Sequence, residues 1–280
     1  MKKLTIILTL SFFISLICFI ISVILTTGFS TNLNFGILLR EFDGGDVNYH
    51  FIDDYSNIEL RVTSAKTIIK PSTDANTRID YKNRNNPTTL EAEVTNNTLQ
   101  IQERWGISFI NWFTGHSELI IQIPEKDYND ISLRISSGSI VTENILVDCQ
   151  NFSIKISSGN MKINGITFEE YTLNCSSGSV TLDNVSGKGD VKVSSGSVTL
   201  NYVEWNDSLN VKVSSGNVNF NLPEDAGMKV DGRVTSGSVK YNLGGNSGKL
   251  STVSGARFGG ENVQDVNVSV SSGSVNFNDN

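Results

Sequence analysis

The sequence is poor in the residue types that most often carry chemistry or bind nucleic acid. Its 280 residues include two histidines, three cysteines and four prolines, and 18% of them are charged, against the roughly 25% usual in soluble domains. Three cysteines cannot build a disulfide framework, and their spacing matches no zinc site. The formal net charge of −7 argues against nucleic acid as a partner, because no net-basic footprint is present. These absences make the sequence more informative about architecture than about a reaction.

Catalytic motifs are missing as well. His50 and His116 both precede the serine-rich repeats described below, so the repeat serines have no local base for nucleophilic catalysis. There is no GxxxxGK[ST] or HExxH motif and no calcium-binding GGxGxD repeat. A carboxylate pair such as Asp183 and Asp190 could in principle hydrolyse a polysaccharide, but the acidic residues share no repeat position that would mark one cleft. We therefore expect no catalytic, cofactor-binding or metal-binding residues.

The N-terminus is predicted to be a membrane anchor. Lys2 and Lys3 precede a run without charge from Leu4 to about Thr27, long enough to cross the ~30 Å hydrocarbon core at about 1.5 Å per residue. The run is too long for a signal-peptide core, and TTGFSTN is a weak cleavage site. We expect residues 1–27 to form an uncleaved anchor, with a cleaved signal peptide as the alternative.

The same segment predicts the compartment. The positive-inside rule places the two lysines in the cytoplasm and the remainder outside a bacterial cell membrane. Without them the 22 basic residues become 20, against 29 acidic residues, so the exported part carries about −9. Cys149 and Cys175 do not occupy equivalent repeat positions, and we interpret them as small buried apolar residues rather than a disulfide.

The C-terminal half is built from an internal repeat. The tripeptide Ser-Ser-Gly, or a near variant, recurs eight times at intervals of about 19 residues, a spacing that indicates a repeat architecture. The glycines expected at the corners are Gly138, Gly159, Gly178, Gly196, Gly216, Gly237, Gly255 and Gly273.

Residues around each glycine alternate between apolar and polar. The positions three and five before the glycine, and two and four after it, are apolar in most copies, which is typical of two short strands with one buried face. We expect the glycine to provide a positive φ at the corner between them, and Asn, Asp or Gly five residues later to form a second corner. A third side of variable length completes a coil.

This pattern predicts an all-β, single-stranded β-solenoid (β-helix) of about eight coils over residues 132–280, stacked about 4.8 Å apart. A β-sandwich with regular turns is the alternative, but it does not explain why equivalent positions hold the same residue types. Residues 28–53 are predicted to be a tether, and residues 54–131 an N-terminal β cap over the open edge of the first coil. The last strand, 268–278, has no evident cap, so the C-terminal coil is a possible pairing edge for a partner.

Two surfaces are candidate binding sites. Basic residues recur four positions before the glycine, on the outward face, as Arg134, Lys155, Lys192, Lys212 and Arg233. Stacked one coil apart they would form a stripe that could contact an anionic cell-wall polymer or an envelope protein. The alternative is that they are ordinary surface lysines and arginines that discourage edge pairing.

The second candidate is an apolar loop between Gln102 and Glu118, with Trp105, Phe109, Trp112 and Phe113. These rings could rest on a membrane interface or stack on a sugar. The favoured interpretation is that they plug the end of the apolar interior.

The SSGSV and SSGNV units, introduced by IPEKDYNDISLRISSGSI, resemble those of the bacterial putative-adhesin family over about residues 50–280. The resemblance implies a membrane-anchored or exported β-solenoid domain of unknown function, associated in some members with cell-envelope stress loci, and it implies no catalytic residues. This chain departs from the pattern at 252–260, where Arg257 and Gly259 occupy apolar positions, so the seventh coil should be loose or bulged.

Together these features predict a non-enzymatic binding, adhesion or scaffold module at the bacterial envelope, without cofactors or nucleic acid. The alternatives are a polysaccharide-active β-helix enzyme, and an envelope-stress sensor or assembly subunit. The sequence leaves the ligand and the oligomeric state open.

Overall fold

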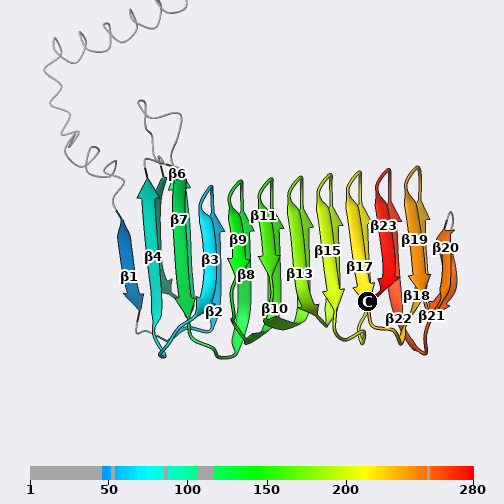
Figure 1. Ribbon diagram of the computed structural model, residues 1–280, viewed down its shortest axis with the longest axis horizontal. Coiled ribbons are helices and arrows are strands. Elements are labelled where there is room, and N and C mark those ends of the chain that lie inside the picture. The colour runs from blue at the N-terminus through cyan, green and yellow to red at the C-terminus, as the bar shows by residue number, and fades with distance from the viewer. Residues whose placement is uncertain (1–45, 52–53, 85–87, 106–115, 251–252) are drawn as a thin grey trace, which may run out of the picture. The chain divides into compact units, whose positions relative to one another are not determined.

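The computed structural model describes residues 46–51, 54–84, 88–105, 116–250 and 253–280, and all regular structure within these ranges is β. The strands form two sheets (Figure 1). Sheet A contains, in spatial order, β1 (Val47–Phe51), β4 (Thr77–Arg84), β7 (His116–Ile123), β3 (Lys66–Pro71), β9 (Ser139–Thr142), β11 (Asn160–Ile163), β13 (Ser179–Val185), β15 (Ser197–Tyr202), β17 (Asn217–Leu222), β23 (Ser274–Asp279), β19 (Ser238–Leu243) and β20 (Asn246–Leu250). Sheet B contains β5 (Thr88–Thr95), β6 (Thr98–Trp105), β2 (Asn57–Val62), β8 (Tyr128–Ile135), β10 (Val147–Ile156), β12 (Ile166–Cys175), β14 (Lys188–Val193), β16 (Leu209–Val213), β22 (Asn262–Val270), β18 (Ala226–Val234) and β21 (Val253–Gly259).

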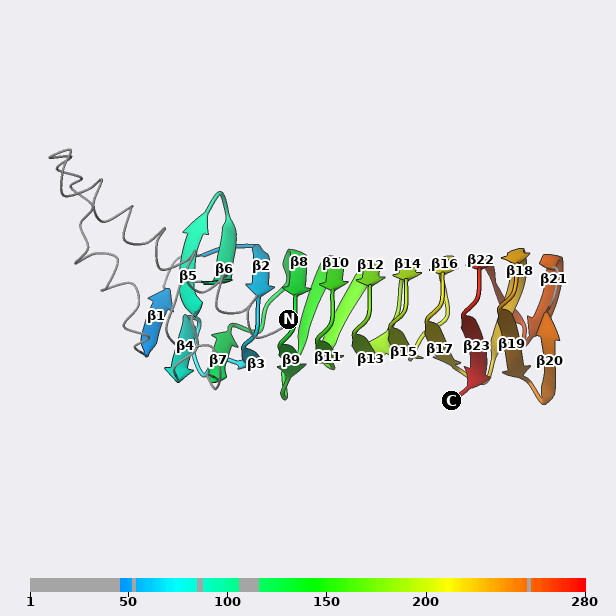
Figure 2. The same ribbon diagram turned by 90° about the horizontal axis from the view of Figure 1, so that it is seen from above.

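Each repeat runs along sheet B, turns at Ser-Ser-Gly and returns along sheet A, so the sheets lie face to face as two layers (Figure 2). Equivalent strands pair in parallel, for example β10 with β12 and β11 with β13. The apolar positions of the repeat point between the layers; Ile140, Val198 and Val275 are 0% exposed. The predicted all-β, solenoid-like fold is confirmed.

The coils do not stack in chain order. The last coil, β22–β23, lies between β16–β17 and β18–β19. The first coil, β2–β3, likewise lies between β6–β7 and β8–β9. The expectation that the last strand is an open pairing edge is therefore wrong, because β23 is paired on both sides within sheet A.

Antiparallel strands close both ends of the stack. β20 pairs antiparallel with β19 and β21 with β18, while β4 and β5 pair antiparallel with β7 and β6. The degenerate copy around residues 252–260 therefore belongs to a cap and is not a coil, which explains why Arg257 is exposed. Residues 47–51, predicted to lie in the tether, form β1, which pairs with β4.

The corner glycines serve a different purpose from the one expected. The glycines with positive φ are Gly165, Gly187, Gly232, Gly244, Gly245, Gly255 and Gly259, so of the predicted corner glycines only Gly255 has this conformation. A Cβ atom at Gly159 would lie 2.3 Å from the Gly138 carbonyl oxygen, and one at Gly178 would lie 2.4 Å from that of Gly159. Glycine is required there because the next coil leaves no room for a side chain.

The corners continue the parallel ladder between coils. The backbone N–H of Asn160 donates to the Gly138 oxygen at 3.1 Å, and that of Ser158 donates to the Ser136 oxygen at 2.8 Å. The second corner also differs by one position: the left-handed residues Asn144 (φ 52°) and Asn184 (φ 61°) follow the glycine by six residues and not five.

The interior holds both described cysteines. Cys149 and Cys175 are unpaired and 5% and 2% exposed, as predicted. The anchor predicted for residues 1–27 lies outside the described residues, and no membrane-spanning helix occurs in the part of the chain that the structure describes.

Candidate basic surface

The predicted basic residues occupy one row on the outer face of sheet B. Arg134 is in register with Lys155, and Lys192 with Lys212. Asn174 lies between Lys155 and Lys192, and Ser269 lies between Lys212 and Arg233. Neighbouring members are thus one or two strands apart, at about 4.8 Å per strand.

Arg61 on β2 belongs to the same row, since it is in register with Arg134. The sequence analysis missed it because the corner of this coil reads Thr63-Ser64-Ala65, and a search aligned on glycine passes over it. A search for basic residues four positions before any corner of small residues, in strands that alternate like IELRV, would have found it. The basic row is defined from here on as Arg61, Arg134, Lys155, Lys192, Lys212 and Arg233.

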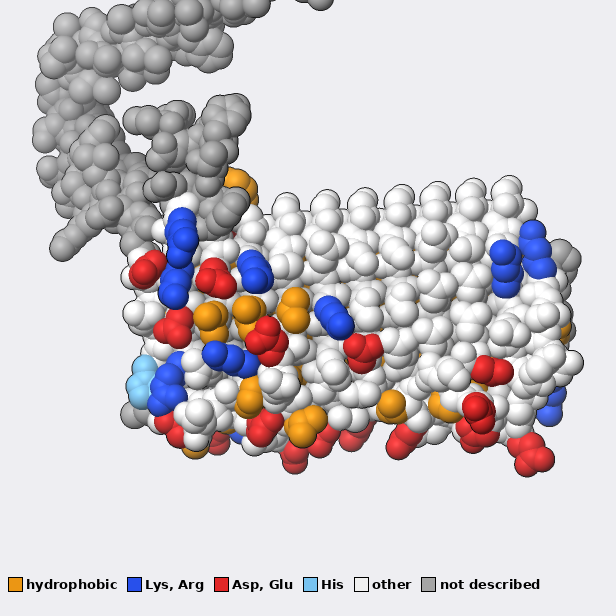
Figure 3. All heavy atoms as spheres, viewed as in Figure 1, with side chains coloured by type: hydrophobic (Ala, Val, Ile, Leu, Met, Phe, Trp, Pro, Cys, Tyr) orange, Lys and Arg blue, Asp and Glu red, His pale blue; other side chains and the backbone are white. Residues whose placement is uncertain are grey.

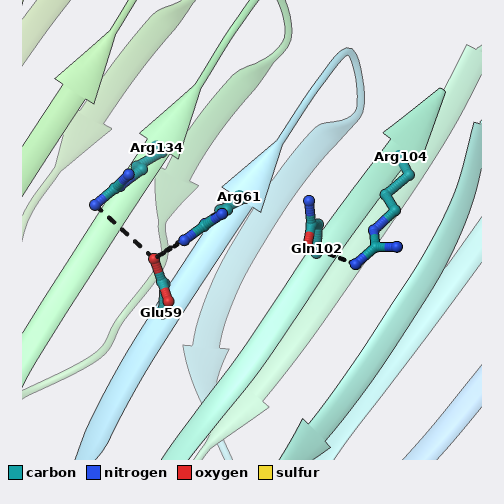
Figure 4. Close-up of polar contacts among 5 residues, drawn as sticks. All are labelled: Glu59, Arg61, Gln102, Arg104 and Arg134. Carbon is teal, nitrogen blue, oxygen red and sulfur yellow. Dashed lines mark hydrogen bonds and ion pairs between the residues drawn. The ribbon is translucent and has the colours of Figure 1, made fainter.

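The row is partly neutralised at its N-terminal end. Glu59 points between two arginines: its Oε1 lies 2.6 Å from Nη2 of Arg61 and 3.9 Å from Nη2 of Arg134 (Figure 4). Beside them, Arg104 donates to Gln102 at 3.2 Å. The single negative charge of Glu59 is thus shared between two guanidinium groups.

Three other members carry uncompensated charge. Lys192 has an ion pair with Asp190 at 3.1 Å, but within the described part of the chain no carboxylate lies within 4 Å of the charged groups of Lys155, Lys212 or Arg233. All three side chains are exposed. Like charges along a sheet face repel one another, so the positive charge of these three side chains is not balanced within the row.

A hollow of about 450 Å³ lies on the C-terminal half of the row. It crosses β14, β16, β22 and β18 and is bordered by Lys192, Lys212 and Arg233. The short Ser269 separates Lys212 from Arg233, which leaves space between two long cationic side chains.

The outer face of sheet A is mostly uncharged over the central coils (Figure 3). Side-chain amides form ladders there: Asn221 donates to Asn201 at 2.6 Å, and Asn276 to Asn219 at 2.8 Å. The basic row therefore belongs to one sheet and is not a general property of the surface.

A second hollow, of about 570 Å³, lies along the edge opposite the Ser-Ser-Gly corners and is acidic. Figure 3 shows acidic side chains along this edge. The carboxylates that line the hollow are those of Asp127, Asp148, Glu169, Glu204 and Asp207. Cys149 also lines it, but burial, with Asp130 and Asp148 nearby, raises the pKa of this thiol to about 12, which keeps it protonated and unreactive.

The candidate catalytic carboxylates are not brought together. Asp183 lies on sheet A and accepts a hydrogen bond from Asn201 at 2.5 Å, while Asp190 lies on sheet B. Within the described ranges, no group of three or more His, Cys, Asp or Glu side chains is arranged to hold a metal ion.

Only Trp105 of the aromatic loop lies within the described residues. It ends β6 and is 63% exposed, so the prediction that it plugs the interior is wrong. Phe109, Trp112 and Phe113 lie outside the described residues. The interior at this end is covered by the antiparallel strands β4 and β5.

A buried carboxylate stabilises the first corner. Glu103 is 2% exposed, and its Oε2 accepts hydrogen bonds from the backbone N–H groups of Thr63, Ser64 and Ala65 at 2.9, 2.8 and 2.9 Å. In later coils the corner N–H groups donate to carbonyls of the neighbouring coil. Burial by itself raises the pKa of Glu103, but the hydrogen bonds from Ser64, Ala65, Ser117 and Thr63 outweigh it, so the pKa is lowered.

The fold defines an all-β, solenoid-like repeat domain with a cationic row on one sheet. The sequence model of the family described as Toastrack DUF4097 matches residues 55–148 and 137–278, and the chain belongs to this family. The resemblance to the putative-adhesin family is thereby confirmed.

Several solved structures are similar to the chain. A putative adhesin from Bacteroides fragilis is 13% identical, with 84% of this chain and 98% of that chain covered and a TM-score of 0.45. A putative lipid binding protein from Parabacteroides distasonis is 16% identical, with coverages of 84% and 97% and a TM-score of 0.46. A putative cell adhesion protein from Clostridium sporogenes is 15% identical, with coverages of 84% and 100% and a TM-score of 0.35. No curated protein matches the chain.

Proposed function

We propose that this protein is a non-enzymatic binding module of the bacterial cell envelope, held at the membrane by residues 1–27, and that its basic row binds a linear anionic polymer outside the cell. The observation that carries the proposal is the alignment of six basic side chains on one face of sheet B.

The geometry suits a polymer better than a single small anion. The cations recur at about 4.8 or 10 Å along the stack, so an extended chain can contact several of them at once. The paired sheets hold these contacts at fixed spacing, and each additional contact then costs little further ordering entropy. The charged groups are exposed to solvent, so each ion pair should contribute only about 0.2–1 kcal/mol.

The test is binding of long poly(glycerol phosphate) and of polygalacturonate to the full chain in non-ionic detergent. Replacing Lys155, Lys212 and Arg233 by Ser should weaken binding of at least one polymer by about three- to hundredfold, because three exposed ion pairs contribute about 0.6–3 kcal/mol together. Raising ionic strength from about 0.1 to 1 M shortens the Debye length from about 10 to 3 Å. This should weaken polymer binding by the wild type about as much as the substitutions do, and it should weaken binding by the variant less.

The matched control replaces Lys162, Lys240 and Lys249 by Ser, because these exposed lysines lie on sheet A and the change in net charge is the same. This variant should bind within about twofold of the wild type. Equal losses for the two variants would mean that only net charge matters, and unchanged binding of both polymers by the row variant would refute the proposal.

A further inference from the structure

The hollow on the outer face of sheet B has the features of a site for one chemical group. This inference rests on the proposed function and narrows it. We infer that the hollow between Lys212 and Arg233 binds a monoanionic phosphodiester group of a linear polymer, while the N-terminal half of the basic row contributes only general attraction.

The hollow is shaped by departures from the repeat. Ser269 stands in the row where most other coils have lysine or arginine, so the space between Lys212 and Arg233 is open. Gly232 replaces the apolar residue found five positions before the corner in other coils, and it has φ +155°. A Cβ atom there would lie 1.8 Å from the Val268 oxygen. The pairing of β18 with β21 on its other side is also irregular here, between Val230 and Gly232.

The charges in the hollow complement a single negative charge. Its three cations face two carboxylates, Asp190 and Asp231, which leaves a net +1. Both carboxylates are engaged, since Asp190 pairs with Lys192 at 3.1 Å and Asp231 accepts the Gly255 N–H at 2.6 Å. In the described structure neither Lys212 nor Arg233 has a carboxylate within 4 Å, so these two side chains are available to a ligand.

The available donors come from three strands. Lys212 on β16, Ser269 on β22 and Arg233 on β18 border the same space, and together they can donate hydrogen bonds to different oxygens of one tetrahedral group. A planar carboxylate would be satisfied by the fork of one arginine. The carboxylates of Asp190 and Asp231 oppose a second negative charge, which disfavours a dianionic phosphomonoester. These features select a phosphodiester.

A soluble polymer fits this surface better than a lipid headgroup. Proteins that rest on membranes usually add apolar or aromatic side chains to the basic ones. The exposed large hydrophobic residues of the described chain are Trp105, Leu146 and Val203, and none of them borders the hollow.

The test compares two double variants of the full chain, K212S/R233S in the hollow and R134S/K155S in the other half of the row. The small probe is glycerophosphoglycerol, which has one phosphodiester, and its binding is measured by calorimetry and by amide chemical shifts. We expect K212S/R233S to lower its affinity by more than twofold and up to about thirtyfold, as for the loss of two exposed ion pairs, and R134S/K155S to change it less than twofold. In the wild type the amide shifts should centre on Asn210, Asn267 and Ser269. Unchanged unfolding temperatures will show that both variants fold.

Three outcomes would overturn the inference. The first is an equal loss of probe affinity in the two variants, and the second is binding of galacturonate as tight as or tighter than binding of the probe. The third is binding to phosphatidylglycerol vesicles that K212S/R233S weakens, without any binding to the soluble probe.

Long polymers separate this inference from the proposed function. If both double variants weaken poly(glycerol phosphate) equally while the probe does not bind the hollow, only the phosphodiester site is refuted. If neither weakens any polyanion, the proposed function is refuted as well.

Discussion

At the scale of single residues, glycine recurs at the corners because neighbouring coils approach closely there, and not because the corners need a positive φ. Each regular corner places its glycine against a carbonyl of the neighbouring coil, as Gly159 does against Gly138. Because every coil meets the next in the same way, the same requirement recurs in each copy. Gly255 lacks such a neighbour, since the nearest atom to its Cβ position is 4.0 Å away, and it belongs to a strand of the cap.

Gly159→Ala should lower the free energy of unfolding by about 3 kcal/mol, because its Cβ would lie 2.3 Å from a backbone oxygen and the coils would have to separate locally. Gly245→Ala is the control: φ is +74° but no atom lies within 4 Å of the Cβ position, so the cost should be about 1 kcal/mol. Urea unfolding measures both. A smaller loss for Gly159→Ala than for the control would contradict the close-approach argument.

Glu103 offers a second residue-scale prediction. Glu103→Gln keeps the shape but loses the charge that accepts three backbone N–H groups, so it should destabilise the protein by about 2–3 kcal/mol at neutral pH. The pKa of Glu103 is lowered in the folded state, so its contribution is fully present above the unfolded pKa of about 4.3 and is lost as pH falls through the folded value.

The difference in unfolding free energy between wild type and Glu103→Gln should therefore shrink as the pH is lowered below about 4. Urea titrations at several pH values measure it. Glu93→Gln is the control, because Glu93 is exposed on β5, and it should change stability little. A difference that grows in acid would contradict the assigned role.

At the scale of elements, the chain leaves a gap in the stack and fills it later. After β17 it skips one position, forms β18–β21, and only then places β22–β23 in the gap. Strand β22 lies between β16 and β18, and its residue Val268 pairs with Val211 on one side and with Gly232 on the other. The last coil therefore couples the C-terminal cap to the rest of the stack.

Truncation after Gly260 removes β22 and β23, so it should destabilise strands inside the stack and not only those at its end. Strands β18 and β19 lose their parallel partners, so amides in residues 226–250 should exchange with solvent much faster, by local opening. Amides of β10 to β13 provide the internal control and should stay protected. A stack in chain order would instead keep residues 226–250 protected, and hydrogen exchange distinguishes the two arrangements.

At the scale of the whole molecule, net charge is a poor guide to the surface. The chain carries −7 overall, yet six of its basic residues lie in one row on sheet B and several of its carboxylates line the edge of the coils opposite the Ser-Ser-Gly corners. This segregation follows from the repeat, because a residue at a given position occupies the same face in every coil. A partner therefore meets a basic or an acidic surface depending on the face it approaches.

The sequence predicted which positions of each coil are buried and which face outward, including five of the six residues of the basic row. It could do so because period-two alternation and a regular repeat length are local properties of the chain. It did not predict Arg61, because an alanine stands where the search required glycine. It also assigned Gly255 to a corner, since a degenerate tripeptide looks the same in a coil and in a cap strand.

What the sequence by itself determined is which side of each strand is buried, because that depends only on neighbours along the chain. The order of the coils was decided by the tertiary structure. All coils present nearly identical edges, so local pattern cannot specify which edges pair; the antiparallel caps and the space left between β17 and β19 do so. The hollow beside Ser269 exists only because the last coil occupies that space.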